Sequence, residues 1–117
     1  IYFFENVGTS AQPSFQLRDD DFGFLRFGNF YNLKPQFADM NGDSRIDLAF
    51  TATDLQRGFT SLYYLSNMAD NGLQVSLAQL VNTNFRIGQT ENATIADIDQ
   101  DGSPDVLVGT SNGAVHY

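Results

Sequence analysis

The apolar residues of this chain fall into short runs, and polar turn segments separate one run from the next. No segment keeps an i, i+3, i+4, i+7 apolar spacing long enough to predict a helix. The runs are rich in aromatic and β-branched residues, which favour strands. Residues 47–51 and 105–110 are apolar at most positions, which is typical of strands buried on both faces. The pattern therefore predicts an all-β protein.

The order of these runs repeats at an interval of 58 residues, so that residues 37–48 return as residues 95–106. Each unit reads as an apolar strand, an acidic loop, a buried strand, a hairpin, an aromatic strand, a turn and an outer alternating strand. The segments expected as third strands are residues 1–6, 61–67 and 114–117, and those expected as fourth strands are residues 14–18 and 73–77. Asn112-Gly113, between two apolar runs, predicts a type I′ hairpin turn.

Four antiparallel strands repeated every 40–60 residues are typical of β-propeller blades. We expect a partial propeller of about two to two and a half blades. Its parts are the end of one blade with a connection (1–34), a full blade (35–92) and the start of the next (93–117). Because a ring has about four to eight blades, we expect the parent chain to continue on both sides. The alternative is that copies of this chain complete a ring together.

The charge of the chain is concentrated in two short windows. The formal net charge is −8, which argues against the phosphate backbone of nucleic acid as a partner. No apolar stretch reaches 18 residues, so membrane insertion is not expected. Seven of the fourteen acidic residues lie in residues 39–47 (loop one) and 97–105 (loop two). Clustered carboxylates repel one another unless a cation or a proton neutralises them.

Both loops offer side-chain oxygens at positions 1, 3, 5 and 9, counted from Asp39 and from Asp97. Calcium takes six to eight oxygen ligands at about 2.3–2.6 Å and tolerates irregular geometry. The backbone carbonyl at position 7 can add a ligand, and a glycine at position 6 permits a sharp turn with positive φ. The sequence therefore predicts two Ca²⁺ sites. Their ligands would be Asp39, Asn41, Asp43, Arg45 and Asp47 in loop one, and Asp97, Asp99, Asp101, Ser103 and Asp105 in loop two.

Three other interpretations of the loops agree less well with the sequence. An EF-hand needs a bidentate Glu at position 12, where these loops have Phe50 and Val108. Asp-Gly and Asn-Gly clusters often mark only turns, but two loops with the same oxygen spacing favour a metal. A glycosidase acid and base would need a carboxylate in an apolar pocket that raises its pKa. The carboxylates of these loops are expected to face one ion instead, so no catalytic residue is predicted.

The stretch Phe37-Ala38-Asp39-Met40-Asn41-Gly42-Asp43, followed by Asp47-Leu48, and its second copy resemble the FG-GAP/VCBS repeat. The resemblance covers nearly the whole chain and implies a β-propeller with calcium between the first two strands of a blade, as in the integrin α-subunit head. Residues 2–9 with residues 13–15 resemble the repeat-joining segment of bacterial surface members. Ser44 departs from the pattern, because the family usually has Gly there.

The resemblance implies a non-enzymatic module, secreted or at the cell surface and of bacterial type. It would serve as a calcium-stiffened scaffold for adhesion or protein interaction. The expected partners are other blades of the same parent chain and a protein or glycan ligand. One alternative is a carbohydrate-binding or carbohydrate-active propeller. Another is a secreted passenger captured with its export machinery.

Overall fold

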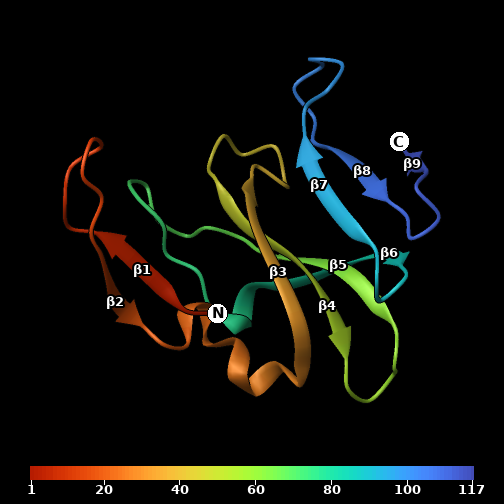
Figure 1. Cartoon of the computed structure of the whole chain (residues 1–117), viewed down its shortest axis with the longest axis horizontal. Coiled ribbons are helices and arrows are strands. Elements are labelled where there is room, and N and C mark those ends of the chain that lie inside the picture. The colour runs from red at the N-terminus through yellow and green to blue at the C-terminus, as the bar shows by residue number, and fades with distance from the viewer.

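The computed structural model describes residues 1–117, which form nine antiparallel strands in three separate sheets (Figure 1). Sheet A has the order β1-β2, sheet B the order β3-β4-β5-β6, and sheet C the order β7-β8-β9. The strands are β1 (Phe3–Asn6), β2 (Phe15–Asp19), β3 (Phe30–Ala38), β4 (Asp47–Asp54), β5 (Thr60–Leu65), β6 (Leu80–Ile87), β7 (Asn92–Ala96), β8 (Asp105–Gly109) and β9 (Val115–His116). Two short 3-10 helices, η1 (Phe22–Gly28) and η2 (Leu77–Gln79), flank sheet B.

Sheet B is a complete blade, because each of its four strands pairs with the next strand along the chain. In its register, Leu48 lies between Phe37 on β3 and Leu65 on β5. Sheets A and C hold two and three strands. The prediction of an all-β chain that forms part of a propeller is confirmed. Of the expected divisions, the one after residue 34 falls inside β3, and the one after residue 92 falls at the start of β7.

The hydrophobic core lies on sheet B. Every residue of β4 from Asp47 to Thr53 is buried, as the mostly apolar pattern of residues 47–51 predicts. The rings of Phe30, Phe50 and Tyr63 pack together with centroids 4.8–5.8 Å apart, which adds to the hydrophobic gain of burying them. The buried cluster consists of Leu25 from η1 together with Leu48, Phe50, Ala52, Tyr63 and Leu65.

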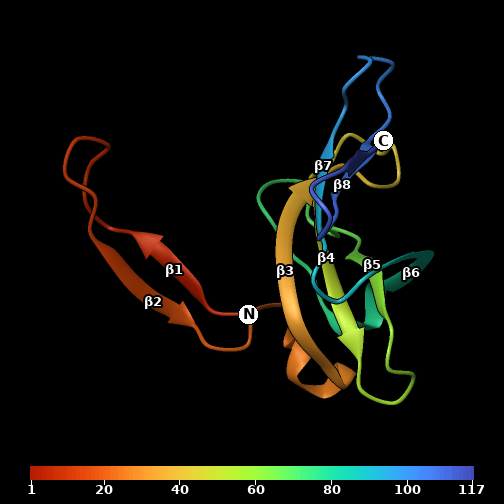
Figure 2. The ribbon, with the colours of Figure 1, turned by 45° about the vertical axis from the view of Figure 1, so that its right-hand side comes forward.

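Sheets A and C are much less covered. All residues of β1 and β2 are exposed, and Figure 2 shows this hairpin standing away from sheet B. Sheet C contributes only Ala93 and Val108 to the buried residues. The prediction that β8 is buried on both faces is wrong for this structure, because sheet C has a neighbouring sheet on one side only. A two-stranded hairpin is marginally stable on its own, so sheet A depends on what packs against it.

The fourth strand of the central blade is β6, and the expectation of a strand at 73–77 is wrong. Residues 73–76 are irregular and lead into η2. Their alternation has another cause, since Val75 and Leu77 pack against the core from this irregular segment. β6 is irregular at Asn84, which has a φ of 61°, and the pairing of β5 with β6 shifts its register.

The turn between β8 and β9 differs from the expected type I′. That type needs positive φ at two central residues, but here only Gly113 has one, at 85°. The Gly113 N–H donates to the Thr110 carbonyl (3.1 Å), and the Thr110 N–H donates to the Ala114 carbonyl (2.8 Å). These bonds describe a three-residue loop that ends in a left-handed glycine, which is another common hairpin connection.

Candidate metal sites

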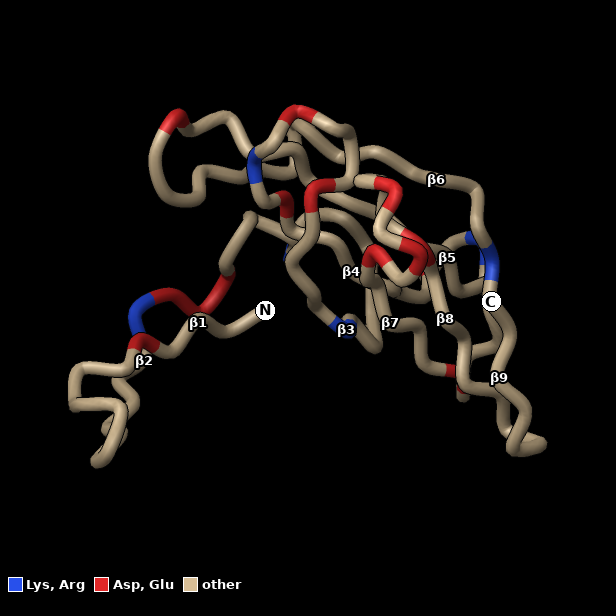
Figure 3. Tube along the Cα trace, turned by 90° about the horizontal axis from the view of Figure 1, so that it is seen from above, with Lys and Arg blue, Asp and Glu red and all other residues tan.

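Loop one joins β3 to β4, and loop two joins β7 to β8, so both lie at the same end of their sheets (Figure 1). Figure 3 shows the acidic residues of the two loops from this end. Position 12 of each loop, Phe50 and Val108, lies within β4 and β8. Each loop therefore runs directly into a strand, as expected for a propeller blade and unlike the helix that follows an EF-hand loop.

The two loops share one backbone shape. Positions 4 and 6 have positive φ in both, with Gly42 at 76° and Ser44 at 67° in loop one, and Gln100 at 60° and Gly102 at 89° in loop two. The prediction of positive φ at position 6 is confirmed. Each loop has glycine at one of these positions and a residue with a Cβ at the other, which strains the backbone there.

The carboxylate at position 1 holds each loop closed through backbone N–H groups. Asp39 accepts hydrogen bonds of 2.8–3.2 Å from the N–H groups of residues 42–44. Asp97 accepts from Asp101 (3.1 Å) and Gly102 (3.0 Å). Several N–H groups that converge on one carboxylate give the loop its shape without an ion, so a metal would meet ligands that are already positioned.

The carboxylate at position 9 is the second side chain that holds each loop closed. Asp47 Oδ2 accepts a 2.9 Å hydrogen bond from Met40 N–H, and Asp105 Oδ2 accepts an equal bond from Ile98 N–H. Asp47 is completely buried, and its Oδ1 also accepts from Asn67 N–H at 2.8 Å. Loop one is thereby joined to the segment after β5. Loop two has no corresponding bond.

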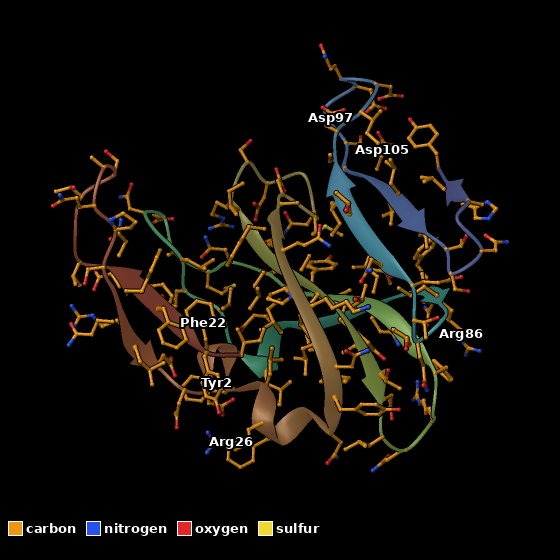
Figure 4. All side chains as sticks on the ribbon, in the orientation of Figure 1. Tyr2, Phe22, Arg26, Arg86, Asp97 and Asp105 are labelled. Atoms are coloured by element: carbon orange, nitrogen blue, oxygen red, sulfur yellow. The ribbon has the colours of Figure 1, made fainter.

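Loop two brings three of its predicted ligands together. Asp97, Asp99 and Asp105 each place one carboxylate oxygen so that the three lie within 4.8 Å of one another. Ligand oxygens on opposite sides of a calcium ion are about 4.6–5.2 Å apart, so these oxygens can share one ion. Figure 4 shows Asp97 and Asp105 side by side where β7 ends and β8 begins. Asp101 lies outside this group, and its Oδ1 accepts from Ser103 N–H at 2.8 Å.

Loop one differs because Arg45 neutralises one of its carboxylates. The Arg45 guanidinium donates to Asp43 Oδ2 from Nε (3.1 Å) and Nη2 (2.9 Å). These bonds hold the pKa of Asp43 below its ordinary value of 3.8. No three carboxylates of loop one converge as those of loop two do. A cation entering loop one would compete with Arg45 for Asp43, whereas loop two has Ser103 at that position.

Two residues near the loops escaped the sequence analysis. Asn67 is buried, and its Oδ1 accepts from Ala69 N–H and Gln74 N–H. Asn6 makes the same two-bonded turn after β1, so the recurrence of Asn after an aromatic strand was the available signal. Tyr117 lies near loop two. Desolvation, and then the negative charges of Asp105 and Asp99, raise the pKa of its hydroxyl above the ordinary 10.0.

These features define a class of protein, a β-propeller repeat module with an acidic loop between the first two strands of each unit. The sequence model of the FG-GAP-like repeat family matches residues 39–108, more than half of the chain and including both loops. The chain therefore belongs to the FG-GAP-like repeat family, whose members are integrin-like, non-enzymatic repeat modules. No curated protein and no solved structure matches it significantly. No helix of the structure has the length and apolar character needed to span a membrane.

Proposed function

We propose that this chain is a calcium-binding propeller module of a secreted or cell-surface protein and that it serves as a rigid scaffold for adhesion or protein interaction. The observation that carries the proposal is the convergence of Asp97, Asp99 and Asp105 on one point. Three hard, anionic oxygens favour calcium over metals that need imidazole or thiolate ligands.

The ion would act on the fold through the first two strands of each unit. Asp97 follows the end of β7, whereas Asp105 is the first residue of β8. A cation bound to both would hold the ends of these strands together and remove the repulsion between their carboxylates. Loop one would bind more weakly, because Arg45 already pairs with Asp43. The carbonyl groups of Arg45 and Ser103 are proposed as additional ligands.

The extracellular location agrees with the affinity expected of such loops. Extracellular calcium modules bind with dissociation constants of about 10⁻⁴–10⁻³ M, and FG-GAP repeats are typical of extracellular proteins. The net charge of −8 agrees with a partner that is not a nucleic acid. We propose a protein or glycan ligand bound by the assembled propeller.

A carbohydrate-binding function receives less support from the structure. The largest cleft is almost wholly apolar, since eight of its nine lining residues are hydrophobic. A sugar site needs convergent polar groups beside its aromatic rings. A glycan array probed with the protein at saturating calcium tests this alternative, and specific binding would favour it over the scaffold.

Thermal unfolding with and without calcium tests the proposal. At about 5 mM calcium, roughly ten times a dissociation constant in the extracellular range, binding adds about 1.4 kcal/mol to the folded state. We expect the melting temperature to rise with calcium and to return to its starting value when EDTA is added. The same concentration of magnesium should give a smaller rise, because Mg²⁺ demands octahedral geometry and gives up its waters reluctantly.

A matched pair of variants separates a specific site from general charge screening. Asp99→Asn removes one carboxylate from the converging group, whereas Asp20→Asn removes one from an exposed turn between β2 and η1. Both change the net charge by the same amount. We expect Asp99→Asn to remove most of the calcium-dependent rise and Asp20→Asn to leave it intact. An equal loss in both variants would show that calcium only screens the charge of the chain.

A further inference from the structure

Three Asn-Gly pairs lie in turns of this chain and differ in how their polar groups are bonded. The pairs are Asn41-Gly42 in loop one, Asn71-Gly72 between β5 and η2, and Asn112-Gly113 between β8 and β9. All six residues are exposed. The three glycines have similar φ values of 76°, 83° and 85°. Exposure and the φ of the glycine therefore do not distinguish one pair from another.

An Asn-Gly pair places a nucleophile next to an amide that it can attack. The glycine nitrogen loses its proton to water and bonds to Cγ of the asparagine, while the bond from Cγ to the side-chain nitrogen breaks. That nitrogen leaves as ammonia, and a five-membered succinimide ring remains. Water then opens the ring at either carbonyl carbon, which gives aspartate or isoaspartate. The net change is the hydrolysis of one amide, and glycine favours it because no Cβ hinders the approach.

In loop one, hydrogen bonds hold both reacting groups. The Gly42 N–H donates to Asp39 Oδ1 at 2.8 Å, and the negative charge of this carboxylate opposes loss of the proton. The Asn41 side chain is held by Asp43, because its Oδ1 accepts from the Asp43 N–H (3.1 Å) and its Nδ2 donates to Asp43 Oδ2 (3.2 Å). Attack of the Gly42 nitrogen on Asn41 Cγ must break such bonds first.

The turn between β8 and β9 holds its pair in a similar way. The Gly113 N–H donates to the Thr110 carbonyl at 3.1 Å. Asn112 Oδ1 accepts from the Ala114 N–H at 3.0 Å and also from the Thr110 hydroxyl. The nucleophile and the amide of this pair are therefore bonded to other groups, as they are in loop one.

The pair between β5 and η2 has none of these bonds. Neither the Asn71 side chain nor the Gly72 N–H forms a hydrogen bond within the chain, although the segment around them is bonded. Asn67 Oδ1 accepts from the N–H groups of Ala69 and Gln74, and Asn67 Nδ2 donates to the Gly72 carbonyl at 2.8 Å. The Gly72 nitrogen can therefore attack Asn71 Cγ without first breaking a hydrogen bond of either group.

We propose that Asn71 is a site of spontaneous modification, where the chain converts asparagine to aspartate and isoaspartate while Asn41 and Asn112 stay intact. Two hydrogen bonds of ordinary strength slow a reaction that must break them by about tenfold to a hundredfold. The pair that lacks these bonds therefore reacts first. The reaction needs water alone, so it proceeds without an enzyme and without a metal ion.

Isoaspartate at position 71 acts on loop one through the turn at Asn67. In isoaspartate the main chain runs through the former side chain, which lengthens the path from Asn71 Cα to the Gly72 nitrogen. The longer path displaces the Gly72 carbonyl from Asn67 Nδ2. Because the Asn67 N–H also donates to the buried Asp47, a loosened turn weakens the link between this segment and loop one. The modification therefore lowers the stability of the central blade.

Peptide mapping of aged protein measures the three rates within one chain. Trypsin cleaves after Arg45, Arg57 and Arg86, which places the three asparagines in separate peptides. The folded protein is kept in EDTA at mildly alkaline pH, in water enriched in heavy oxygen, which labels each carboxyl group that forms. We expect the label to enter position 71 at least about tenfold faster than positions 41 and 112. Equal rates, or a faster rate at either of the other two positions, overturn the proposal.

The same chain unfolded in guanidinium chloride separates the effect of the fold from that of neighbouring residues. Unfolding removes all of these hydrogen bonds, so we expect the three rates to converge. A preference for Asn71 that persists unchanged in the unfolded chain would come from the local sequence and overturns the proposal.

The Asn71→Gln variant tests the effect on stability, because glutamine would have to close a six-membered ring and reacts far more slowly. After ageing, we expect the urea-unfolding midpoint of the original chain to fall and that of Asn71→Gln to stay unchanged. If the original chain keeps its midpoint although position 71 is fully modified, the step from Asn71 to Asn67 is wrong.

Discussion

The different surroundings of the two position-9 carboxylates predict unequal costs for the same substitution. Asp47→Asn and Asp105→Asn each replace one carboxylate oxygen by an NH₂ group. Asp47 is completely buried and accepts two backbone hydrogen bonds, one at each oxygen. Asp105 is half-buried and accepts one. An amide can keep only one acceptor oxygen, so only at Asp47 must a buried N–H group lose its partner.

The magnitude follows from these bonds. A hydrogen bond to a charged group contributes roughly 1.5–3 kcal/mol, and an unsatisfied buried donor costs about 1–3 kcal/mol. We therefore expect Asp47→Asn to lower the free energy of unfolding by about 2–4 kcal/mol. Asp105→Asn should cost less than about 1 kcal/mol, because its amide oxygen can turn toward Ile98 N–H. Against a typical total of about 5–15 kcal/mol, the first change is large and the second small.

Urea unfolding in EDTA, followed by tyrosine fluorescence, measures both changes without a contribution from metal. Tyr63 lies in the buried cluster and reports on sheet B. All variants are compared at one protein concentration, because association would shift apparent stability. If both variants lose the same free energy within about 0.5 kcal/mol, which is the additivity error of such comparisons, the bond from Asn67 to Asp47 does not stabilise the blade as argued.

Three further predictions concern the loops and the Asn turns. Ser44→Gly should tighten calcium binding to loop one in a calorimetric titration, because the φ of 67° strains a residue with a Cβ; unchanged affinity would show that strain is not what weakens the site. An NMR titration of the Asp43 carboxyl group should give a pKa below 3.8, and Arg45→Gln should bring this pKa back toward 3.8. Because folding lowers the pKa of Asp43, the stability that its carboxylate contributes is present above pH 3.8 and is lost as the pH falls through the lowered pKa. Asn67→Ala should destabilise the protein more than Asn6→Ala in urea unfolding, because Asn67 is buried and also donates to the Gly72 carbonyl; equal losses would contradict this.

The sequence predicted the parts of the fold that local pattern controls. Residues 47–51 read as a strand buried on both faces and are the centre of the blade. The prediction of positive φ at position 6 rested on Gly102 of loop two, because loop one has Ser44 there. The fourth strand was misplaced because the alternation of residues 73–77 has the same period as a strand but arises from packing of Val75 and Leu77 on the core. β6, in contrast, is a strand because it pairs with β5. The sequence of β6 has no alternating pattern that would predict this pairing.

Only some of the residues of the candidate metal site could be predicted from the sequence, for a related reason. The spacing of oxygens identified both loops, and nothing in the sequence separated Asp99, which joins the converging group, from Asp101, which does not. In the structure, Asp101 Oδ1 accepts a hydrogen bond from Ser103 N–H, which the oxygen spacing did not indicate. The role of Asn67 depends on a contact between residues twenty positions apart. Such long-range bonds follow from the folded arrangement, which periodicity does not encode.

Asn32, Lys34 and Gln36 of β3 donate to the backbone carbonyls of Gln89, Glu91 and Ala93, and these bonds form an inter-blade ladder between sheets B and C. This ladder bears on how such repeats can diverge. Its donors reach carbonyl groups, which every amino acid carries, so the receiving strand can change its side chains without losing the bonds. A duplicated or exchanged unit would find the same row of acceptors whatever its sequence. Pairs of positions across the joint between Gln36 and residues 93–95 need not vary together, and correlated substitutions would not reveal the contact. Because most of the bonds across this joint end on backbone atoms, whole units could be inserted, lost or exchanged with little loss of these bonds.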